Sequence, residues 1–283
     1  MRLAIDIGGT WLRYETVGEK EICGKIPSQE NDLVDFLETT LREHPEIDAV
    51  VISFAGQVHD GTILSAPNLR VREPDLRDYI ESRYPVRLLL ENDLNCAALA
   101  EALYWDSSYL CALYSGSGLG AGLVEEGRLI HGFRSLAGEI GHLPYREAPF
   151  ACGCGKRNCL ELYASGSGMA KWMHHFGCDG SVDLAAMRDS DDPRCRQIAE
   201  GYLDALLHAA ADLVTLCNPR HLILGGGVIA HNPWILAPLK ERLSDYALAA
   251  SLEGLTIELS RLEEASLEGA KLLLDRMNTS PFA

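Results

Sequence analysis

Apolar residues along this chain follow two recurring patterns, and together these predict its secondary structure. Short continuous apolar runs predict buried strands at 3–7, 49–56, 86–92, 221–227 and 256–260. Apolar residues at helical spacing predict helices at 29–44, 73–84, 94–105, 197–217, 234–246 and 267–277. Strands that alternate with helices indicate an α/β protein, with a mixed central sheet covered by helices.

One order of elements occurs twice. The stretch LAIDIGGTWLRYETVGEKEICG, residues 3–24, is typical of a strand, a glycine loop, a strand, the turn GEK and another strand. CALYSGSGLGAGLVEEGRLIHG, residues 111–132, repeats this order. The repeat predicts a duplicated fold of two lobes with a central cleft. We expect the lobes to comprise residues 1–106 with 264–283, and residues 107–263.

Composition narrows the range of partners. With 47% hydrophobic and 23% charged residues, the 283-residue chain resembles a globular protein with room for two domains. Its apolar runs are short for a membrane span, and Asp6 interrupts the first of them, so we expect a cytosolic protein with no membrane partner. The net charge of -16 and scattered Lys and Arg disfavour a nucleic-acid partner. A nucleotide stays possible, because backbone amides and a metal ion can hold phosphates.

Three glycine-rich turns each follow an apolar strand, at Gly8-Gly9-Thr10, at 116–120 and at Gly225-Gly226-Gly227. Any one of them alone predicts no more than a tight turn. Three at strand ends favour a phosphate cradle, because glycine lets backbone amides approach a ligand closely. The chain has no G-x-x-x-x-G-K-[ST] motif. A strand follows 116–122 where a dinucleotide-binding fold needs a helix, so hydride chemistry is disfavoured.

Polar residues gather where the strand 86–92 meets the next helix, in the sequence Glu91-Asn92-Asp93-Leu94-Asn95. Asp93 or Asn95 could serve only as the helix cap. One cap would suffice, however, and the stretch offers more polar groups than capping needs. Asp93 is therefore a candidate base that orients a substrate hydroxyl and accepts its proton. Asn68, beside Pro67, is a weaker polar candidate that a turn would explain nearly as well.

Three of the nine cysteines form a cluster, Cys152-x-Cys154-x4-Cys159. Zinc prefers four tetrahedral N or S ligands, so the cluster predicts a structural Cys3His site. His142 is the natural fourth ligand and His131 is its rival. A redox role is weaker because no C-x-x-C is present, and a nucleic-acid knuckle conflicts with the charge. We interpret the remaining cysteines as small core residues at 23, 96, 111 and 217, and as free thiols of a connecting stretch at 178 and 195.

These motifs occur in the order expected of the ROK family (repressors, open reading frames and sugar kinases), which the chain resembles from about residue 3 to about residue 275. The motifs are DIGGT, ENDLN, SGSGLGAG, AGEIGH, CGCGKRNCLE and NPRHLILGGGV. The resemblance implies an actin-like (ribonuclease H-like) fold and transfer of the ATP γ-phosphate to a hexose hydroxyl. It also implies a homodimer, and it leaves open glucose or an N-acetylhexosamine such as N-acetylglucosamine or N-acetylmannosamine.

The resemblance also implies a role for each motif residue. Asp93 would be the catalytic base, and the hydroxyls of the sugar would be held by Asn68, Asn92, Glu139, His142 and Glu161. Zinc would be bound by His142, Cys152, Cys154 and Cys159. ATP and Mg²⁺ would lie against Asp6, Gly8, Gly9, Thr10, Ser117, Gly118, Gly225, Gly226 and Gly227. The chain departs from the family pattern at four positions without losing a catalytic group. Trp11 replaces a frequent lysine, Gln57 replaces a proline, Ser117 replaces a threonine, and Asn158 replaces a glycine.

The rival function is a sugar-responsive regulator that binds sugar without turnover. Such regulators carry an N-terminal DNA-binding helical module, whereas here the first core strand begins at about residue 3, so we expect none. A non-catalytic scaffold is a third alternative, which the presence of Asp93 disfavours.

Overall fold

The computed structural model describes residues 1–18 and 22–279, with side chains as far as residue 277. Most of the predicted turn at 18–20, Glu21 of the strand predicted after it, and residues 280–283 of the predicted lobe segment 264–283 lie outside the described residues. The chain divides into two compact units. Unit 1 comprises Met1–Leu103, His131–Ala137 and Leu262–Ala283, and unit 2 comprises Tyr104–Ile130 and Gly138–Arg261.

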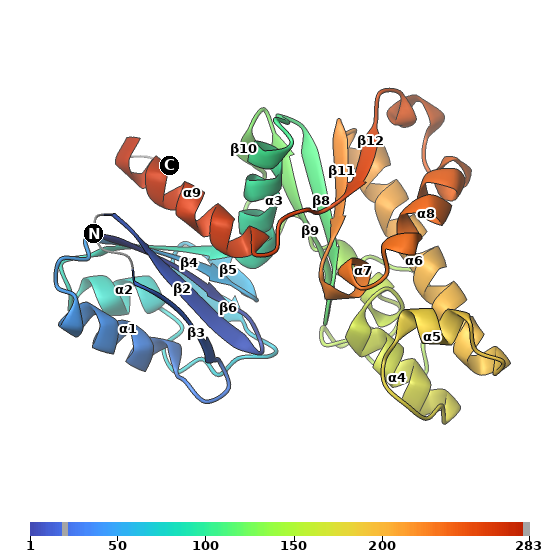
Figure 1. The fold of residues 1–283 in the computed structure, drawn as a ribbon, viewed down its shortest axis with the longest axis horizontal. Coiled ribbons are helices and arrows are strands. Elements are labelled where there is room, and N and C mark those ends of the chain that lie inside the picture. Colours follow the sequence, from blue (N-terminus) through green and yellow to red (C-terminus); the bar gives the residue numbers. More distant parts are fainter. Residues whose placement is uncertain (19–21, 280–283) are drawn as a thin grey trace. The chain divides into compact units, whose positions relative to one another are not determined.

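Unit 1 is built on a five-stranded sheet with the order β3-β2-β1-β4-β7 (Figure 1). Its strands are β1 (Arg2–Ile7), β2 (Trp11–Val17), β3 (Cys23–Pro27), β4 (Ala49–Phe54) and β7 (Arg87–Asn92). The first three strands are antiparallel, and β4 and β7 extend the sheet in parallel with β1. A short hairpin of β5 (Gln57–His59) and β6 (Thr62–Ser65), which the sequence patterns did not predict, follows β4.

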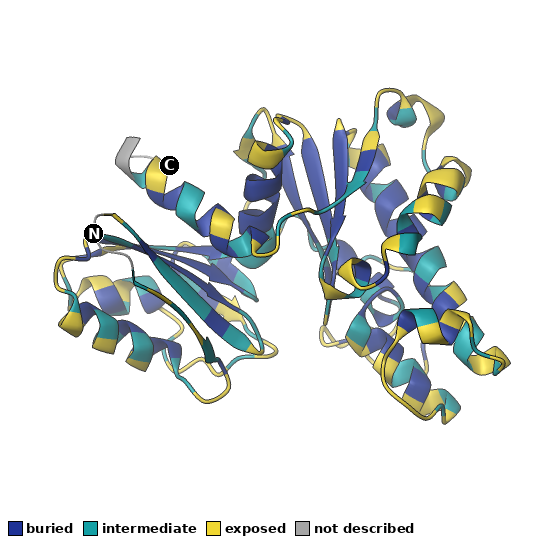
Figure 2. Cartoon of the chain, viewed as in Figure 1, coloured by how far each residue is buried: buried dark blue, intermediate teal, exposed yellow. Residues whose placement is uncertain are grey.

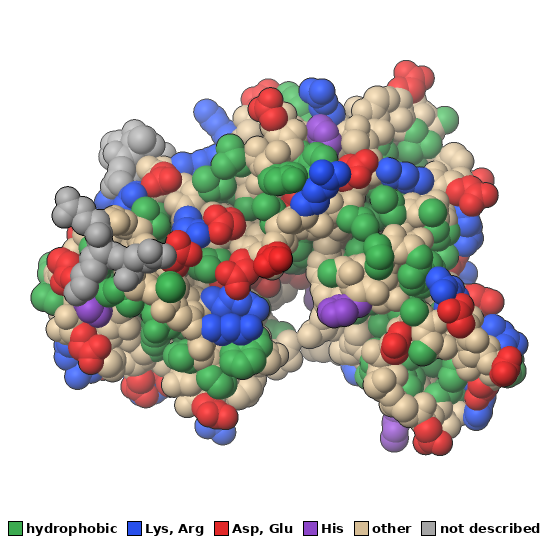
Figure 3. All heavy atoms as spheres, viewed as in Figure 1, with side chains coloured by type: hydrophobic (Ala, Val, Ile, Leu, Met, Phe, Trp, Pro, Cys, Tyr) green, Lys and Arg blue, Asp and Glu red, His purple; other side chains and the backbone are tan. Residues whose placement is uncertain are grey.

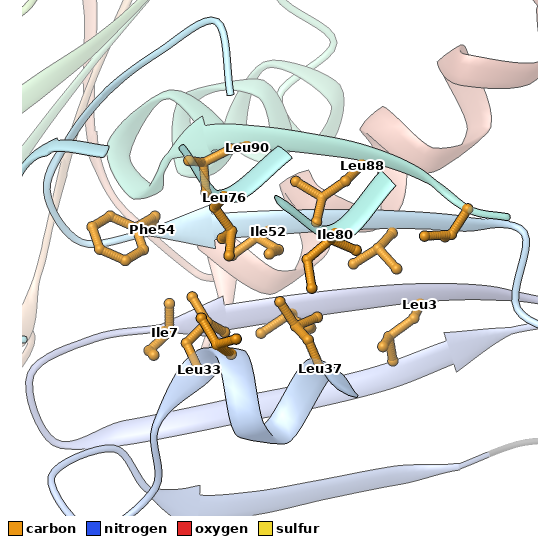
Figure 4. Close-up of a cluster of buried hydrophobic side chains, with 14 of the residues drawn as sticks. Leu3, Ile7, Leu33, Leu37, Ile52, Phe54, Leu76, Ile80, Leu88 and Leu90 are labelled. Atoms are coloured by element: carbon orange, nitrogen blue, oxygen red, sulfur yellow. The ribbon is translucent and has the colours of Figure 1, made fainter. Parts of the chain in front are cut away.

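Helices α1 (Leu33–Glu43) and α2 (Leu76–Glu81) cover one face of this sheet (Figure 4). Asp32 caps α1 by accepting hydrogen bonds from the amides of Val34 and Asp35, so the helix begins later than the predicted residue 29. Because strand side chains alternate between faces, every second residue of the central strands enters this core. The labelled core side chains are Leu3, Ile7, Leu33, Leu37, Ile52, Phe54, Leu76, Ile80, Leu88 and Leu90.

Helix α9 (Ala265–Thr279) and helix α3 (Asp93–Tyr104) as far as Leu103 also belong to unit 1. The last helix packs against β1 and β4, although it is remote from them in sequence. It also approaches α3 closely, because a Cβ built on Gly269 would lie 1.9 Å from the carbonyl oxygen of Cys96. The absence of a side chain at Gly269 is therefore what permits this helix contact.

Unit 2 repeats the sheet of unit 1, with the order β10-β9-β8-β11-β12. Its strands are β8 (Leu110–Ser115), β9 (Leu119–Glu125), β10 (Arg128–Leu129), β11 (His221–Gly225) and β12 (Thr256–Leu259). Again the first three are antiparallel, and the last two continue in parallel with the first. The central strands are buried along their length (Figure 2). The duplicated strand order confirms the repeat that the sequence predicted.

The helices of unit 2 differ in part from the predictions. They are α4 (Gly166–Phe176), α5 (Leu184–Arg188), α6 (Pro193–Cys217), α7 (Gly227–Ala230) and α8 (Leu236–Arg242). The long helix begins before residue 197, because Asp192 caps it and Pro193 starts its first turn. Cys195 is thus helical and not part of a connecting stretch. The helix predicted at 234–246 is confirmed over its middle as α8, but its two ends are 3-10 turns.

Two glycines in helices make a matched test of this packing. Gly269→Ala should lower stability by about 1–3 kcal/mol, because the new methyl group meets backbone that cannot rotate away. Gly201→Ala, in α6, should raise stability by up to ~1 kcal/mol, because alanine favours the helix. Its Cβ would lie at an ordinary 3.7 Å from the ring of Tyr163. Thermal unfolding midpoints of both variants measure this; a stabilised Gly269→Ala would contradict the close contact of α9 with α3.

Acidic and basic side chains are interspersed on the face drawn in Figure 3. Among the helices that the structure describes, none has both the length and the apolar character that crossing a bilayer requires.

Candidate active site and metal centre

The start of α3 is fixed by Asn92. Its side-chain oxygen accepts hydrogen bonds from the amides of Leu94 (2.9 Å) and Asn95 (3.2 Å). Its Nδ2 donates to the carbonyl oxygen of Gly56 at 3.0 Å, which ties α3 to the segment after β4. Asn92 therefore provides the cap that the sequence left to Asp93 or Asn95, and its amide is engaged within the protein.

Asp93 is the first residue of α3 and is partly exposed. Its Oδ1 accepts hydrogen bonds from Asn92 Nδ2 at 3.2 Å and from the amide of Leu94 at 3.0 Å. A helix N-terminus carries partial positive charge and stabilises a carboxylate placed there. Asp93 is thus an oriented, accessible carboxylate.

Glu91 and His131 form a contact that the sequence patterns did not reveal. Glu91 Oε2 lies 2.8 Å from His131 Nε2, and the Glu91 side chain is only 8% exposed. The hydrogen bond to Glu91 raises the pKa of His131 and outweighs the opposing effect of its burial. No local signal pairs two residues so far apart in sequence.

The first glycine loop is held by residues from two other segments. The Gly8 amide donates to the Trp11 carbonyl at 3.0 Å. Gln29 Nε2 donates to the carbonyl oxygens of Gly9 (2.8 Å) and Asn68 (2.9 Å). A Cβ on Gly9 would lie 3.0 Å from Asn68 Cβ. The structure therefore brings Asn68 to the loop, and Gln29 is a positioning residue that sequence reasoning missed.

Asp6 lies on β1 in register with Ser53 of β4 and Arg13 of β2. Ser53 Oγ donates to Asp6 Oδ1 at 2.9 Å, and Arg13 Nη1 donates to Oδ2 at 3.1 Å. Burial raises the pKa of Asp6, and the bonds from Ser53 and Arg13 act in the opposite direction. Arg13 Nε also lies 3.2 Å from Glu264 Oε1, an ion pair without hydrogen-bond geometry. The carboxylate thus stands within a network of fixed charges.

The second glycine loop, in unit 2, contacts Glu161. The Leu119 amide donates to Glu161 Oε2 at 3.1 Å, and a Cβ on Gly118 would lie 2.7 Å from the same oxygen. A side chain at residue 118 would require the Glu161 carboxylate to move. The carbonyl oxygen of Ser117 accepts a hydrogen bond from Ser167 at the start of α4. The predicted phosphate loop and one predicted sugar ligand are therefore neighbours.

The third glycine turn joins β11 to α7. Gly226 has φ +86, and a Cβ there would lie 2.5 Å from the Ser115 carbonyl oxygen. A Cβ on Gly225 would meet the Tyr114 ring at 2.6 Å. Glycine is thus required by close packing against β8, whether or not a ligand binds.

Four predicted metal ligands converge in unit 2: His142, Cys152, Cys154 and Cys159, whose ligand atoms all lie within 4.8 Å of one another. Cys152 Sγ is 3.6 Å from His142 Nδ1, and Cys154 Sγ is 3.4 Å from Cys159 Sγ. A tetrahedral zinc with Zn–S bonds of ~2.3 Å and a Zn–N bond of ~2.0 Å spaces its ligands about 3.5–3.8 Å apart. The residues fit a structural zinc ion.

Backbone hydrogen bonds build this cluster. Tyr145 and Ala148 donate to the carbonyl oxygens of Asn158 and Arg157, and Leu160 donates to that of Leu143. These bonds place the segment after His142 beside the segment around Cys159. Below them lies a small apolar cluster formed by Ala148, Cys152, Cys159 and Leu162.

Both predicted glutamates contact this centre. Glu139 Oε2 lies 3.6 Å from His142 Nε2, the ring nitrogen that faces away from the cysteines. A carboxylate on the second nitrogen is a common support for a metal-binding histidine. Glu161 Oε1 accepts a hydrogen bond from Cys152 Sγ at 3.3 Å. Burial, and in addition the charge of Glu161, raise the pKa of Cys152 to about 11, which a bound cation would reverse.

The structure groups His142, and not its rival His131, with the three cysteines, while His131 pairs with Glu91. A second grouping, Cys178, Asp192 and Cys195, occurs among the described residues. It lacks a histidine, and its carboxylate is already bonded to Arg194. The expectation of a core position for Cys23 was wrong, because its side chain is exposed.

The predicted site residues divide between the two units. Unit 1 holds Asp6, Gly8, Gly9, Thr10, Asn68, Asn92 and Asp93. Unit 2 holds Ser117, Gly118, Glu139, His142, Cys152, Cys154, Cys159, Glu161, Gly225, Gly226 and Gly227.

Two curated relatives resemble the chain over most of its length. The glucokinase of Halalkalibacterium halodurans is 27% identical over 98% of this chain and 96% of its own. The N-acetyl-D-glucosamine kinase of Escherichia coli O9:H4 is 28% identical, covering 88% of this chain and 90% of its own.

Solved structures share the fold. A ROK family glucokinase from Streptomyces griseus, in complex with glucose and AMPPNP, matches with a TM-score of 0.73 and 28% identity over 96% of this chain and 98% of its own. A ROK family transcriptional regulator, a homologue of the E. coli MLC protein, matches with a TM-score of 0.78 and 24% identity over 96% of this chain and 77% of its own. The actin-like fold class is thereby confirmed. A profile of the ROK family matches residues 2–277, and the chain belongs to the ROK family.

Proposed function

We propose that this protein is an ATP-dependent sugar kinase that transfers the γ-phosphate to a hydroxyl of glucose or of an N-acetylhexosamine. The observation that carries the proposal is the Asp93 carboxylate, oriented by Asn92 at the start of α3. The named activities of the full-length relatives support it.

In this proposal Asp93 accepts the proton of the attacking hydroxyl. Phosphoryl transfer depends chiefly on positioning and charge stabilisation, and a fixed carboxylate contributes by orienting the nucleophile. The sugar hydroxyls are bound by Asn68, Asn92, Glu139, His142 and Glu161. The bonds that Asn92 and Glu161 already make within the protein leave fewer groups for a ligand, so we assign both a positioning role as well.

ATP would be held by backbone amides of the three glycine turns. A Cβ on Gly8 or Gly227 would meet no atom within 4 Å, so the backbone there is open to close contact with phosphate oxygens. Mg²⁺, when bound, would neutralise the phosphate charge near Asp6. The residues fit this role, because the carboxylate is already oriented by Ser53 and Arg13.

Zinc in this proposal is structural. With four protein ligands the ion has no open position for water or substrate. It would instead fix the backbone on which Glu139 and Glu161 are carried, since each of them contacts a metal ligand.

The alternative is a regulator that binds sugar without turnover. The solved ROK family transcriptional regulator, which has the same fold, supports this alternative. A coupled ADP-release assay over glucose, mannose, N-acetylglucosamine and N-acetylmannosamine separates the two functions. We expect one hexose or N-acetylhexosamine to raise ADP production well above the rate without sugar. Binding of a sugar by calorimetry, with no ADP release for any of them, would support the regulator and reject the kinase.

A further inference from the structure

The buried carboxylate of Glu91 organises the residues around Asp93. Glu91 Oε1 accepts hydrogen bonds from the Asn92 amide at 2.9 Å and from Asn95 Nδ2 at 2.8 Å. Asn92 in turn caps α3 and contacts the base. One oxygen of Glu91 thus binds both Asn92 and Asn95, the residues on either side of Asp93 and Leu94.

The other oxygen of Glu91 is held by His131 at 2.8 Å. A carboxylate that is 8% exposed is costly to bury unless it is paired and hydrogen-bonded. His131 can supply both, because its ring donates through Nε2 and the raised pKa favours its charged form. Removing the imidazole would leave Oε2 without this donor and would favour reorientation of the Glu91 side chain.

His131 begins the 131–137 loop, which belongs to unit 1 although the chain on both sides of it belongs to unit 2. The Ala137 amide donates to the His131 carbonyl at 3.0 Å, which closes the loop. Ser135 Oγ lies 3.1 Å from His59 Nδ1 on the hairpin of unit 1. The loop is therefore attached to unit 1 at two places, and Glu139 follows it two residues after Ala137.

We propose that His131 is a positioning residue for phosphoryl transfer, which holds Glu91 and through it the start of α3 and the Asp93 carboxylate. This inference rests on the proposed kinase function. It assigns the 131–137 loop a part in setting the base, beyond connecting two segments of unit 2.

The test compares three variants of the full-length protein. His131→Leu removes the donor and should lower kcat about 10- to 100-fold, since small displacements of a reacting group have effects of this size. The KM for ATP should stay within about twofold, because the pair does not contact the glycine turns. His131→Gln restores a donor through its amide and should keep kcat within about threefold of wild type. Phe133→Ala, in the same loop and 96% exposed, should change neither constant.

A second measurement does not depend on turnover. Hydrogen exchange of the segment 91–96 reports on the amides of Asn92, Leu94 and Asn95. The Asn92 amide donates to Glu91, and the other two donate to the side chain of Asn92, so these hydrogen bonds protect all three amides from exchange. Exchange should be at least about tenfold faster in His131→Leu and unchanged in His131→Gln and Phe133→Ala.

Wild-type kcat and wild-type exchange in His131→Leu would overturn the inference. So would an equal loss in His131→Leu and His131→Gln, because that would show that no hydrogen bond to Glu91 is involved. If the wild-type protein phosphorylates no sugar, the kinase proposal fails. Amide exchange then still decides whether His131 sets the start of α3.

Discussion

Asp93→Asn should lower kcat by about 10²- to 10⁴-fold while the KM for sugar and for ATP change little. The amide keeps an oxygen at the position of Oδ1, so it can still accept hydrogen bonds from Asn92 and Leu94. What it loses is the capacity to accept a proton from the sugar hydroxyl. The change therefore tests the base chemistry and leaves the cap of α3 in place. Steady-state ADP release with the preferred hexose measures it.

A matched control is available in the same unit. Asp32→Asn alters a carboxylate that caps α1 through the amides of Val34 and Asp35. It should cost at most a few tenths of a kcal/mol, because asparagine caps as well as aspartate, and it should leave kcat unchanged. If Asp93→Asn retained more than about a tenth of the wild-type kcat, Asp93 would not be the base.

Loss of zinc should have the second large effect. Metal analysis of the wild-type protein should find about one equivalent of zinc per chain, and Cys154→Ser should lose it. Because metal binding contributes directly to folding, the thermal midpoint of the variant should fall by several degrees or more. Sugar phosphorylation should fall as well, since Glu139 and Glu161 contact the metal ligands His142 and Cys152.

Cys178→Ser controls for the loss of a thiol elsewhere in unit 2. Cys178 belongs to the second cysteine grouping, whose carboxylate is engaged by Arg194. The zinc content of the Cys178→Ser variant should therefore match that of the wild-type protein. A folded, active wild-type protein without zinc would reject the metal centre. Loss of zinc in Cys178→Ser but not in Cys154→Ser would show that the ion binds at the second cysteine grouping, and the proposed ligands would be wrong.

Local sequence patterns predicted most of the strands and the duplicated order of elements. The apolar strands and the paired glycine loops repeat in order at 3–24 and 111–132, and the two sheets repeat strand for strand. Strand periodicity and turn chemistry act over a few residues, so they can be read without knowledge of distant contacts. Helices α4 and α5 and the hairpin β5–β6 were not predicted. The helix predicted at 234–246 is shorter than expected, because 3-10 turns replace both of its ends.

The sequence by itself determined which residue types are available: the three cysteines at fixed spacing, the glycines at strand ends and the carboxylate of Asp93 before a helix. Only the tertiary structure decided between His142 and His131 as partner of the cysteines, by bonding His131 to Glu91. It likewise assigned Gln29 to the first glycine loop and Arg13 to Asp6. The physical reason is that hydrogen bonds and ion pairs between distant segments depend on strand register and on close packing. Those are properties of the folded chain, and no local preference encodes them.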